Sequence, residues 1–346
     1  MDRRGNAGAG PDGLMAAAAG LGLCFAARTL ARRSRWMGLG GKNVLITGGS
    51  RGLGLVMARE FAARAARVVA CARDPDELDR AAADLRRRGF DLATFVCDVT
   101  DRDQVNRTIA DVERHSGQID VLVNNAGTIS VGPMEVMNVD DYDEAMRTHF
   151  WGPVYTTLAV LPGMRRRRSG RVVNISSIGG KVAVPHLLPY CASKFALTGF
   201  SEGLRAELKK DGIYVTTVCP GLMRTGSPRN AFFKGRNRAE YALFKLSDST
   251  PFTSMDAGRA ARRIVLACQR AESEVVLGVQ ARVAAKFHGL FPGVGSELYG
   301  LINHALPGPG GIGERRARGK DSESAVSESF LTALTRRAAA ENNELA

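Results

Sequence analysis

The chain has 346 residues, of which 45% are hydrophobic and 24% are charged, a balance that predicts one large folded core and excludes disorder over most of the length. The formal net charge is +13, but runs such as Arg86–Arg88 and Arg165–Arg168 lie at the ends of predicted helices, where cations complement the helix dipole. No aromatic residues interleave these runs, so we do not expect a nucleic-acid partner. The six cysteines lie far apart and form no Cys/His cluster of ligand spacing, which favours a reducing, cytoplasmic location without a metal.

Residues 1–40 are predicted to be a basic and apolar extension of the folded domain. Residues 13–27 carry no charge, but these fifteen residues are fewer than the roughly 17–25 that a membrane-spanning helix needs. The basic stretch that follows lacks the small residues of a signal-peptide cleavage site. Three alternatives stay open, namely a disordered extension, a membrane-associating helix and a cleaved targeting segment. A start at Met37 is a further alternative.

From Lys42 onward, short apolar stretches alternate with segments of helical periodicity. The stretches expected to form strands are 43–47, 67–72, 92–99, 120–127, 170–177, 212–221 and 272–278. Strands joined by helices of ten or more residues imply right-handed crossovers and a parallel sheet covered on both faces. We therefore predict a doubly wound α/β fold, in which one Rossmann-type domain of about seven strands occupies residues 41–280.

Beyond residue 280 the sequence changes character. Residues 281–313 are amphipathic and broken by Gly and Pro, whereas residues 314–346 are charged and serine-rich and predict a mobile tail with a short helix. Residues 281–306 are expected to cover a pocket, join subunits or lie on a membrane. Together with residues 13–35 they are the candidate segments for peripheral membrane contact.

A glycine-rich turn, TGGSRGLG at residues 47–54, follows the first strand and opens a helix. Glycines at such a turn let a pyrophosphate approach the helix N-terminus, where free N–H groups and the dipole favour an anion. The Thr-Gly-x-x-x-Gly-x-Gly spacing between a strand and a helix therefore predicts nucleotide binding.

Tyr190 and Lys194 are four residues apart in a predicted helix and so share one face, and Ser177 ends the strand before that helix. A free tyrosine has a pKa of about 10, and a nearby ammonium group favours its phenolate. The three side chains are expected to meet at the carboxyl ends of the strands, with Tyr190 as acid and base.

Four motifs in order, TGGSRGLG, NNAG at 124–127, the Ser177/Tyr190/Lys194 set and PGLMRT at 220–225, resemble the short-chain dehydrogenase/reductase family over residues 40–280. This resemblance implies an oxidoreductase that interconverts a carbonyl and a secondary alcohol, in which Ser177 holds the substrate oxygen and Lys194 holds the nicotinamide ribose. It also implies a homo-oligomer, either a dimer or a tetramer. The implied cofactor-binding residues are Thr47, Gly48, Ser50, Arg51, Gly52, Leu53, Gly54, Arg73, Asp98, Val99, Asn125, Ala126, Gly127, Tyr190, Lys194, Pro220, Gly221 and Thr225.

The second strand ends at Ala72, where an enzyme that prefers NAD usually has an acidic residue. Here Arg73 follows, and Arg51 lies in the glycine turn, so two guanidinium groups favour NADP(H), with NAD(H) as the alternative. Asp74 is predicted to cap the next helix; in the alternative it turns to the ribose.

Two positions depart from the family pattern. His149 stands where many members have an asparagine that helps to hold a proton-relay water, and it is either a packed histidine or a member of that relay. Ala65 stands where glycine is usual. If residue 65 has a positive φ, alanine costs up to about 1 kcal/mol of stability.

The substrate is less constrained by the sequence. Phe232, Phe233, Tyr241 and Phe244 lie in the covering segment 225–255 and predict an apolar carbonyl or alcohol, such as a steroid, retinoid or lipid-derived ketone, unless they only pack that segment on the core. The alternatives are an acyl-thioester ketoreductase and a non-catalytic protein that binds NADP(H).

Overall fold

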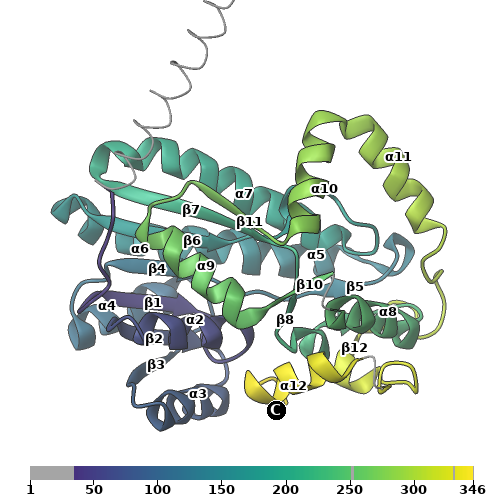
Figure 1. Cartoon of the computed structure of the whole chain (residues 1–346), viewed down its shortest axis with the longest axis horizontal. Coiled ribbons are helices and arrows are strands. Elements are labelled where there is room, and N and C mark those ends of the chain that lie inside the picture. The colour runs from purple at the N-terminus through teal and green to yellow at the C-terminus, as the bar shows by residue number, and fades with distance from the viewer. Residues whose placement is uncertain (1–34, 251–252, 330–331, 346) are drawn as a thin grey trace, which may run out of the picture.

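The computed structural model describes residues 35–250, 253–329 and 332–345, and a seven-stranded parallel sheet lies at its centre (Figure 1). The strand order is β3-β2-β1-β4-β6-β7-β11, so it reverses between β1 and β4. The predicted doubly wound α/β fold of seven strands is therefore confirmed. The strands are β1 (Asn43–Thr47), β2 (Arg67–Ala72), β3 (Leu92–Val96), β4 (Val121–Asn124), β6 (Gly170–Ile175), β7 (Ile213–Pro220) and β11 (Glu274–Leu277).

Helices cover both faces of the sheet. One apolar core lies under α2 (Gly52–Ala62), α3 (Pro75–Arg87) and α9 (Ala257–Gln269), and the other under α4 (Arg102–Ser116), α6 (Gly152–Arg167) and α7 (Leu188–Leu208). Because the central strands face a core on both sides, β1, β4 and β6 are buried throughout. Helix α5 (Val139–Met146) runs into α6 through a π-helical turn, η2 (Arg147–Trp151).

The segment that follows β7 forms a lid from β8 (Leu222–Arg224), β9 (Phe232–Phe233), α8 (Asn237–Ser249) and β10 (Ser254–Asp256). Strand β9 pairs with β5 (Ser130–Val131) and with β12 (Ala317–Arg318), so three distant segments share one small sheet. Phe233 and Tyr241 are buried in a small apolar core of this lid. Short 3-10 turns are η1 (Met134–Val136), η3 (Ile178–Gly180), η4 (Lys209–Asp211), η5 (Ser227–Asn230) and η6 (Gly319–Asp321).

A hairpin of two helices, α10 (Val279–Leu290) and α11 (Pro292–Asn303), extends from the sheet (Figure 1). Both helices expose apolar side chains, namely Val279, Val283, Phe287, Leu290, Val294, Leu298, Leu301 and Ile302. Within the described ranges, no helix combines the length and the apolar character that crossing a membrane requires. Residues 13–35 were the N-terminal candidate for membrane contact, and all of them except Arg35 lie outside the described residues.

Two predicted boundaries need correction. The folded domain begins before residue 41, because Met37 and Leu39 are buried in the core and the Met37 N–H donates to the Gln269 carbonyl at 2.9 Å. The expectation of a mobile tail over 314–346 was also wrong for its described part. Ser322, Ser327 and Thr335 are buried, and α12 (Ala333–Glu341) packs against the lid elements α8 and β8 (Figure 1). These serine and threonine hydroxyls find hydrogen-bond partners within the fold, so polar composition did not prevent their burial.

Candidate active site

Ser177, Tyr190 and Lys194 meet at the carboxyl edge of the sheet, as the sequence predicted. Ser177 follows β6, and the other two side chains come from the first two turns of α7. The Lys194 Nζ lies 5.6 Å from the centre of the Tyr190 ring and donates a hydrogen bond to the Ile175 carbonyl at 2.8 Å. The Ser177 Oγ accepts from the Gly179 N–H at 3.0 Å. The end of β6 therefore positions both the serine and the lysine.

Burial shifts the two titratable groups of this set in the directions expected for a low-dielectric site. It raises the pKa of Tyr190 to about 12, although a hydrogen bond with Ser177 acts in the opposite direction. It lowers the pKa of Lys194 to about 7. The tyrosine therefore carries its proton at neutral pH, which is the form that can donate to a carbonyl oxygen.

His149 lies in the π-helical turn η2 and is 1% exposed. Its Nε2 accepts a hydrogen bond from the Thr128 N–H at 3.1 Å, so its proton is on Nδ1, which donates to the Ser193 Oγ at 2.8 Å. Ser193 in turn donates to the Tyr190 carbonyl at 2.8 Å. The imidazole also packs edge-on against the Tyr190 ring, with centroids 5.3 Å apart.

The pKa of His149 lies well below its usual range, mainly because the ring is buried and to a smaller extent because Lys194 is positively charged. The imidazole is therefore neutral, and both of its nitrogens already have partners. This arrangement agrees better with a histidine that positions Tyr190 than with one that passes protons. Ser193, which completes the chain of hydrogen bonds, was missed by sequence reasoning, because a serine within a helix gives no signal of its own.

The glycine turn joins β1 to α2, and the NNAG motif lies against it. The Thr47 Oγ1 accepts hydrogen bonds from the N–H groups of Asn125 and Ala126 at 3.0 and 3.1 Å. The Asn125 amide donates to the Thr47 and Gly48 carbonyls at 3.2 and 3.0 Å. A Cβ at position 54 would stand 2.0 Å from the Gly48 carbonyl oxygen, so only glycine fits there. These contacts fix the shape of the turn at the N-terminus of α2, the position that suits a pyrophosphate.

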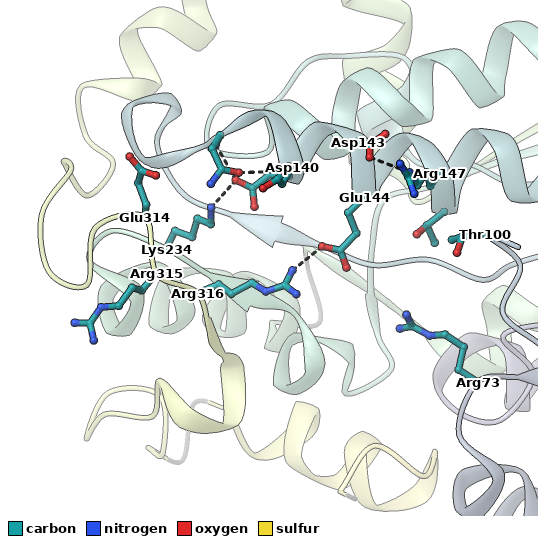
Figure 2. Close-up of a pocket in the computed structure, with 13 residues that line it drawn as sticks. Arg73, Thr100, Asp140, Asp143, Glu144, Arg147, Lys234, Glu314, Arg315 and Arg316 are labelled. Atoms are coloured by element: carbon teal, nitrogen blue, oxygen red, sulfur yellow. Dashed lines mark hydrogen bonds and ion pairs between the residues drawn. The ribbon is translucent and has the colours of Figure 1, made fainter.

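Arg73 follows β2 and is exposed at the edge of a cavity of about 580 Å³ that also lies beside Thr100 and Arg147 (Figure 2). On the other side of this cavity, Lys234 pairs with Asp141 and Arg316 pairs with Glu144, each at 2.5 Å. The structure shows no carboxylate within ion-pair distance of Arg73 among the described residues. Arg73 is therefore available to an anion from outside the chain.

Asp74 caps α3, as predicted, because its Oδ1 accepts from the Glu77 N–H at 3.0 Å. Arg51 is engaged within the chain: its Nη1 lies 2.7 Å from Glu77 and its Nε 3.6 Å from Glu344. The second arginine proposed for a phosphate is thus paired in this structure, whereas the aspartate that would favour NAD is held in the cap.

The remaining predicted cofactor residues lie along the same edge. The Asp98 carboxylate accepts from the Thr100 N–H and hydroxyl at 2.9 and 2.8 Å, and Val99 packs on Gly152. Pro220 ends β7, the Gly221 N–H donates to the Leu277 carbonyl, and the Thr225 hydroxyl donates to Ser227 at 2.9 Å. The structure brings all of these positions to the carboxyl edge of the sheet, with Ser50 and Gly127 in the neighbouring loops and Leu53 in the first turn of α2.

Sequence reasoning missed one group of residues at this site. Residues 341–344, which comprise the last residue of α12 and the turn after it, lie against the glycine turn. No local pattern predicts this contact, because it joins positions almost 300 residues apart in the chain.

Comparison with known proteins agrees with this geometry. The family model described as short chain dehydrogenase matches residues 42–233. Dehydrogenase/reductase SDR family member 7B of Danio rerio is 32% identical over 299 residues, covering 84% of this chain and 94% of the relative. Human 17-beta-hydroxysteroid dehydrogenase 13 is 33% identical over 193 residues, covering 55% of this chain and 64% of the relative.

Solved structures agree as well. A short-chain dehydrogenase from Streptomyces avermitilis has a TM-score of 0.65 and 34% identity, covering 76% of this chain and 97% of that one. A gluconate 5-dehydrogenase from Burkholderia cenocepacia, solved with NADP and tartrate, has a TM-score of 0.63 and 28% identity, covering 71% of this chain and 96% of that one. With the motifs, the strand order and these matches in agreement, the chain belongs to the short-chain dehydrogenase family.

Proposed function

We propose that this protein is an NADP(H)-dependent oxidoreductase that interconverts a carbonyl and a secondary alcohol, with Tyr190 as the acid and base. The observation that carries the proposal is the meeting of Ser177, Tyr190 and Lys194 at the edge of the sheet where the glycine turn also lies. The dinucleotide, when bound, supplies or accepts the hydride.

The chain's own residues manage the substrate oxygen and its proton. Ser177 and Tyr190 hold that oxygen by hydrogen bonds and fix its orientation. In the reducing direction Tyr190 donates its proton to the oxygen, which agrees with a pKa of about 12 for this side chain in the free protein. In the oxidising direction it must accept a proton, and a protonated Lys194 nearby stabilises the phenolate that does so.

The preference for NADP(H) rests on Arg73, which is exposed and has no carboxylate partner in the described part of the chain, and on Asp74, which is held in the helix cap. A guanidinium group at the end of the second strand attracts the additional phosphate of NADP(H). The similar gluconate 5-dehydrogenase from Burkholderia cenocepacia was also solved in complex with NADP.

For the substrate we propose an apolar ketone or alcohol, such as a steroid, retinoid or lipid-derived one. The support is the apolar surface near the start of α7, where Leu188 and Phe195 are 39% and 42% exposed, together with the exposed apolar side chains of α10 and α11. The lid aromatics do not add to this support, because Phe233 and Tyr241 are buried in the lid's own core. A second candidate, a 3-oxoacyl-thioester reductase, is favoured by 39% identity over 183 residues to a putative ketoacyl reductase from Streptomyces violaceoruber.

The test is NADPH oxidation with a panel of steroid ketones, retinal, long-chain ketones and a 3-oxoacyl thioester. We expect turnover on an apolar member, and its loss in Tyr190→Phe, which keeps the ring but removes the hydroxyl. The variant is expected still to bind NADPH, because the other residues of the cofactor site are unaltered. Tight NADPH binding without turnover of any member would instead favour a non-catalytic, regulatory protein.

We further propose that the α10–α11 hairpin contacts a membrane surface peripherally, because both helices expose apolar side chains on the same hairpin as Arg282 and Lys286. Co-flotation with anionic vesicles is expected, and Leu290→Glu with Leu301→Glu should abolish it. If the unaltered protein does not bind vesicles but forms a dimer or tetramer that the variant has lost, the hairpin joins subunits instead.

A further inference from the structure

The chain turns sharply after α12 and directs one side chain back toward the sheet. Asn343 adopts a left-handed backbone conformation, with φ at +59°, which asparagine tolerates better than most residues. The Glu344 N–H then donates to the Ala339 carbonyl at 2.9 Å, which closes the helix end. Glu344 itself is only 3% exposed.

This turn lies on the glycine turn of the predicted dinucleotide site. The N–H of Gly52, the first residue of α2, donates to the Asn342 carbonyl at 2.9 Å. The Asn343 side-chain amide donates to the Ser50 carbonyl at 2.9 Å. One Glu344 carboxylate oxygen stands 2.5 Å from the place that a Cβ on Gly52 would take, so the carboxylate rests against the bare backbone of that glycine.

Further contacts anchor the same four residues. Arg59 of α2 donates to the Glu341 carbonyl at 2.7 Å and to the Asn342 side chain at 3.0 Å. At the other end of the site, the Asn342 amide donates to the Thr225 carbonyl at 3.3 Å. Asn230 of the lid donates to the Glu344 main-chain carbonyl at 3.1 Å. Residues 341–344 therefore bridge the glycine turn and the lid, two regions between which a dinucleotide would lie.

We propose that residues 341–344 are an internal ligand of the dinucleotide site and compete with the dinucleotide for it. This inference rests on the proposed function, because it takes the glycine turn to be the pyrophosphate site. The Gly52 N–H has one hydrogen to donate, and Asn342 has taken it. The Glu344 side chain stands directly over Gly52, and the space there admits either this side chain or a pyrophosphate.

Docking of residues 341–344 would therefore lower the affinity of the protein for the dinucleotide. When a binding site is open for a fraction f of the time, the apparent Kd is the intrinsic Kd divided by f. If the segment is docked for about nine-tenths of the time, the dinucleotide binds about ten-fold more weakly than to an open site. Displacement of residues 341–344 by a partner or by substrate would then increase the affinity for the dinucleotide.

The experiment compares NADPH binding by the full chain with two altered forms, using the fluorescence of bound NADPH. One form ends after residue 332 and lacks α12 and the turn. The other is the variant Glu344→Lys, which places a cation beside Arg51 and against the N-terminus of α2 and should release the segment. Because this variant keeps the full chain, it serves as a check if the shortened form misfolds. The matched control is Arg337→Ala, an exposed α12 residue whose partner is the Glu341 side chain.

We expect the Kd for NADPH to fall about ten-fold or more in both altered forms and to stay unchanged in the control. Hydrogen exchange at residues 341–345 of the full chain should speed up when NADPH is added, because the segment is displaced. An unchanged or weaker affinity in both altered forms, or slower exchange at 341–345 with NADPH, would overturn the competition. Absence of NADPH binding in every form would instead refute the dinucleotide site itself.

Discussion

The Glu344 carboxylate makes the docking of residues 341–344 dependent on pH. Burial raises the pKa of this side chain to about 7, while Arg51 and the Asn230 amide act in the opposite direction and Glu77 acts in the same one. Asp248 of α8 is a further buried acid of this region; burial raises its pKa to about 8, and Glu344 acts in the same direction. The groups that face Glu344 are therefore Arg51 from the glycine turn, Glu77 from α3, and Asn230 and Asp248 from the lid.

The sign follows from the two states of the segment. A released glutamate has a pKa of about 4.3 to 4.5, so docking takes up a proton between roughly pH 4.5 and pH 7. Docking is strongest below that range, weakens as the pH rises through it, and is constant above it. With 1.36 kcal/mol for each pH unit, the docking free energy weakens by about 3 to 4 kcal/mol over the whole range, which is roughly 300-fold in the docking equilibrium.

The assay is calorimetric titration with NADP⁺, which is stable in acid, from pH 5 to pH 8. Dividing the Kd of the full chain by the Kd of the form that ends after residue 332 removes the titration of the dinucleotide's own phosphates. We expect this ratio to fall by as much as a hundred-fold as the pH rises to 7. In Glu344→Gln, which cannot titrate, the ratio should not change. A ratio that is constant in the unaltered protein, or that rises with pH, would refute the argument.

Three further predictions concern the site and its support. His149→Asn should lower kcat but leave its pH profile unchanged, because the neutral imidazole has both nitrogens engaged; a shifted profile would restore the relay role. Ala65→Gly should raise the free energy of unfolding in urea by about 0.5–1 kcal/mol, since residue 65 has φ at +60°, whereas Ala63→Gly, at φ −61°, should lower it. Arg73→Glu should raise the Kd for NADP⁺ at least about ten-fold and leave the Kd for NAD⁺ nearly unchanged. The control Arg315→Glu, across the same cavity, should change neither Kd. Equal losses of affinity for both dinucleotides in Arg73→Glu would contradict a role of Arg73 in binding the additional phosphate.

Much of the fold could be predicted because its signals are local. The seven strands were identifiable as apolar stretches, and the Asp74 cap and Pro75 mark the start of α3 within three residues of sequence. A positive φ at Ala65 was raised only as a condition, because the family resemblance has glycine there, and the structure has φ at +60°. The tail was not predictable in the same way, because serine-rich composition indicates exposure, and only its hydrogen-bond partners in the lid explain its burial.

The sequence by itself indicated which groups the proposed chemistry would use, a glycine turn, a serine, a tyrosine and a lysine in fixed order, on a chain whose hydrophobic pattern predicts a parallel α/β sheet. These are properties of residue type and of spacing over one or two elements, and the regular geometry of helices and strands sets where such side chains lie. Only the tertiary structure decided which groups surround that chemistry, such as the Ser193 hydroxyl that engages His149 and the Glu344 carboxylate on the Gly52 backbone. Contacts between distant segments depend on how whole elements pack, and no local pattern of residues records them.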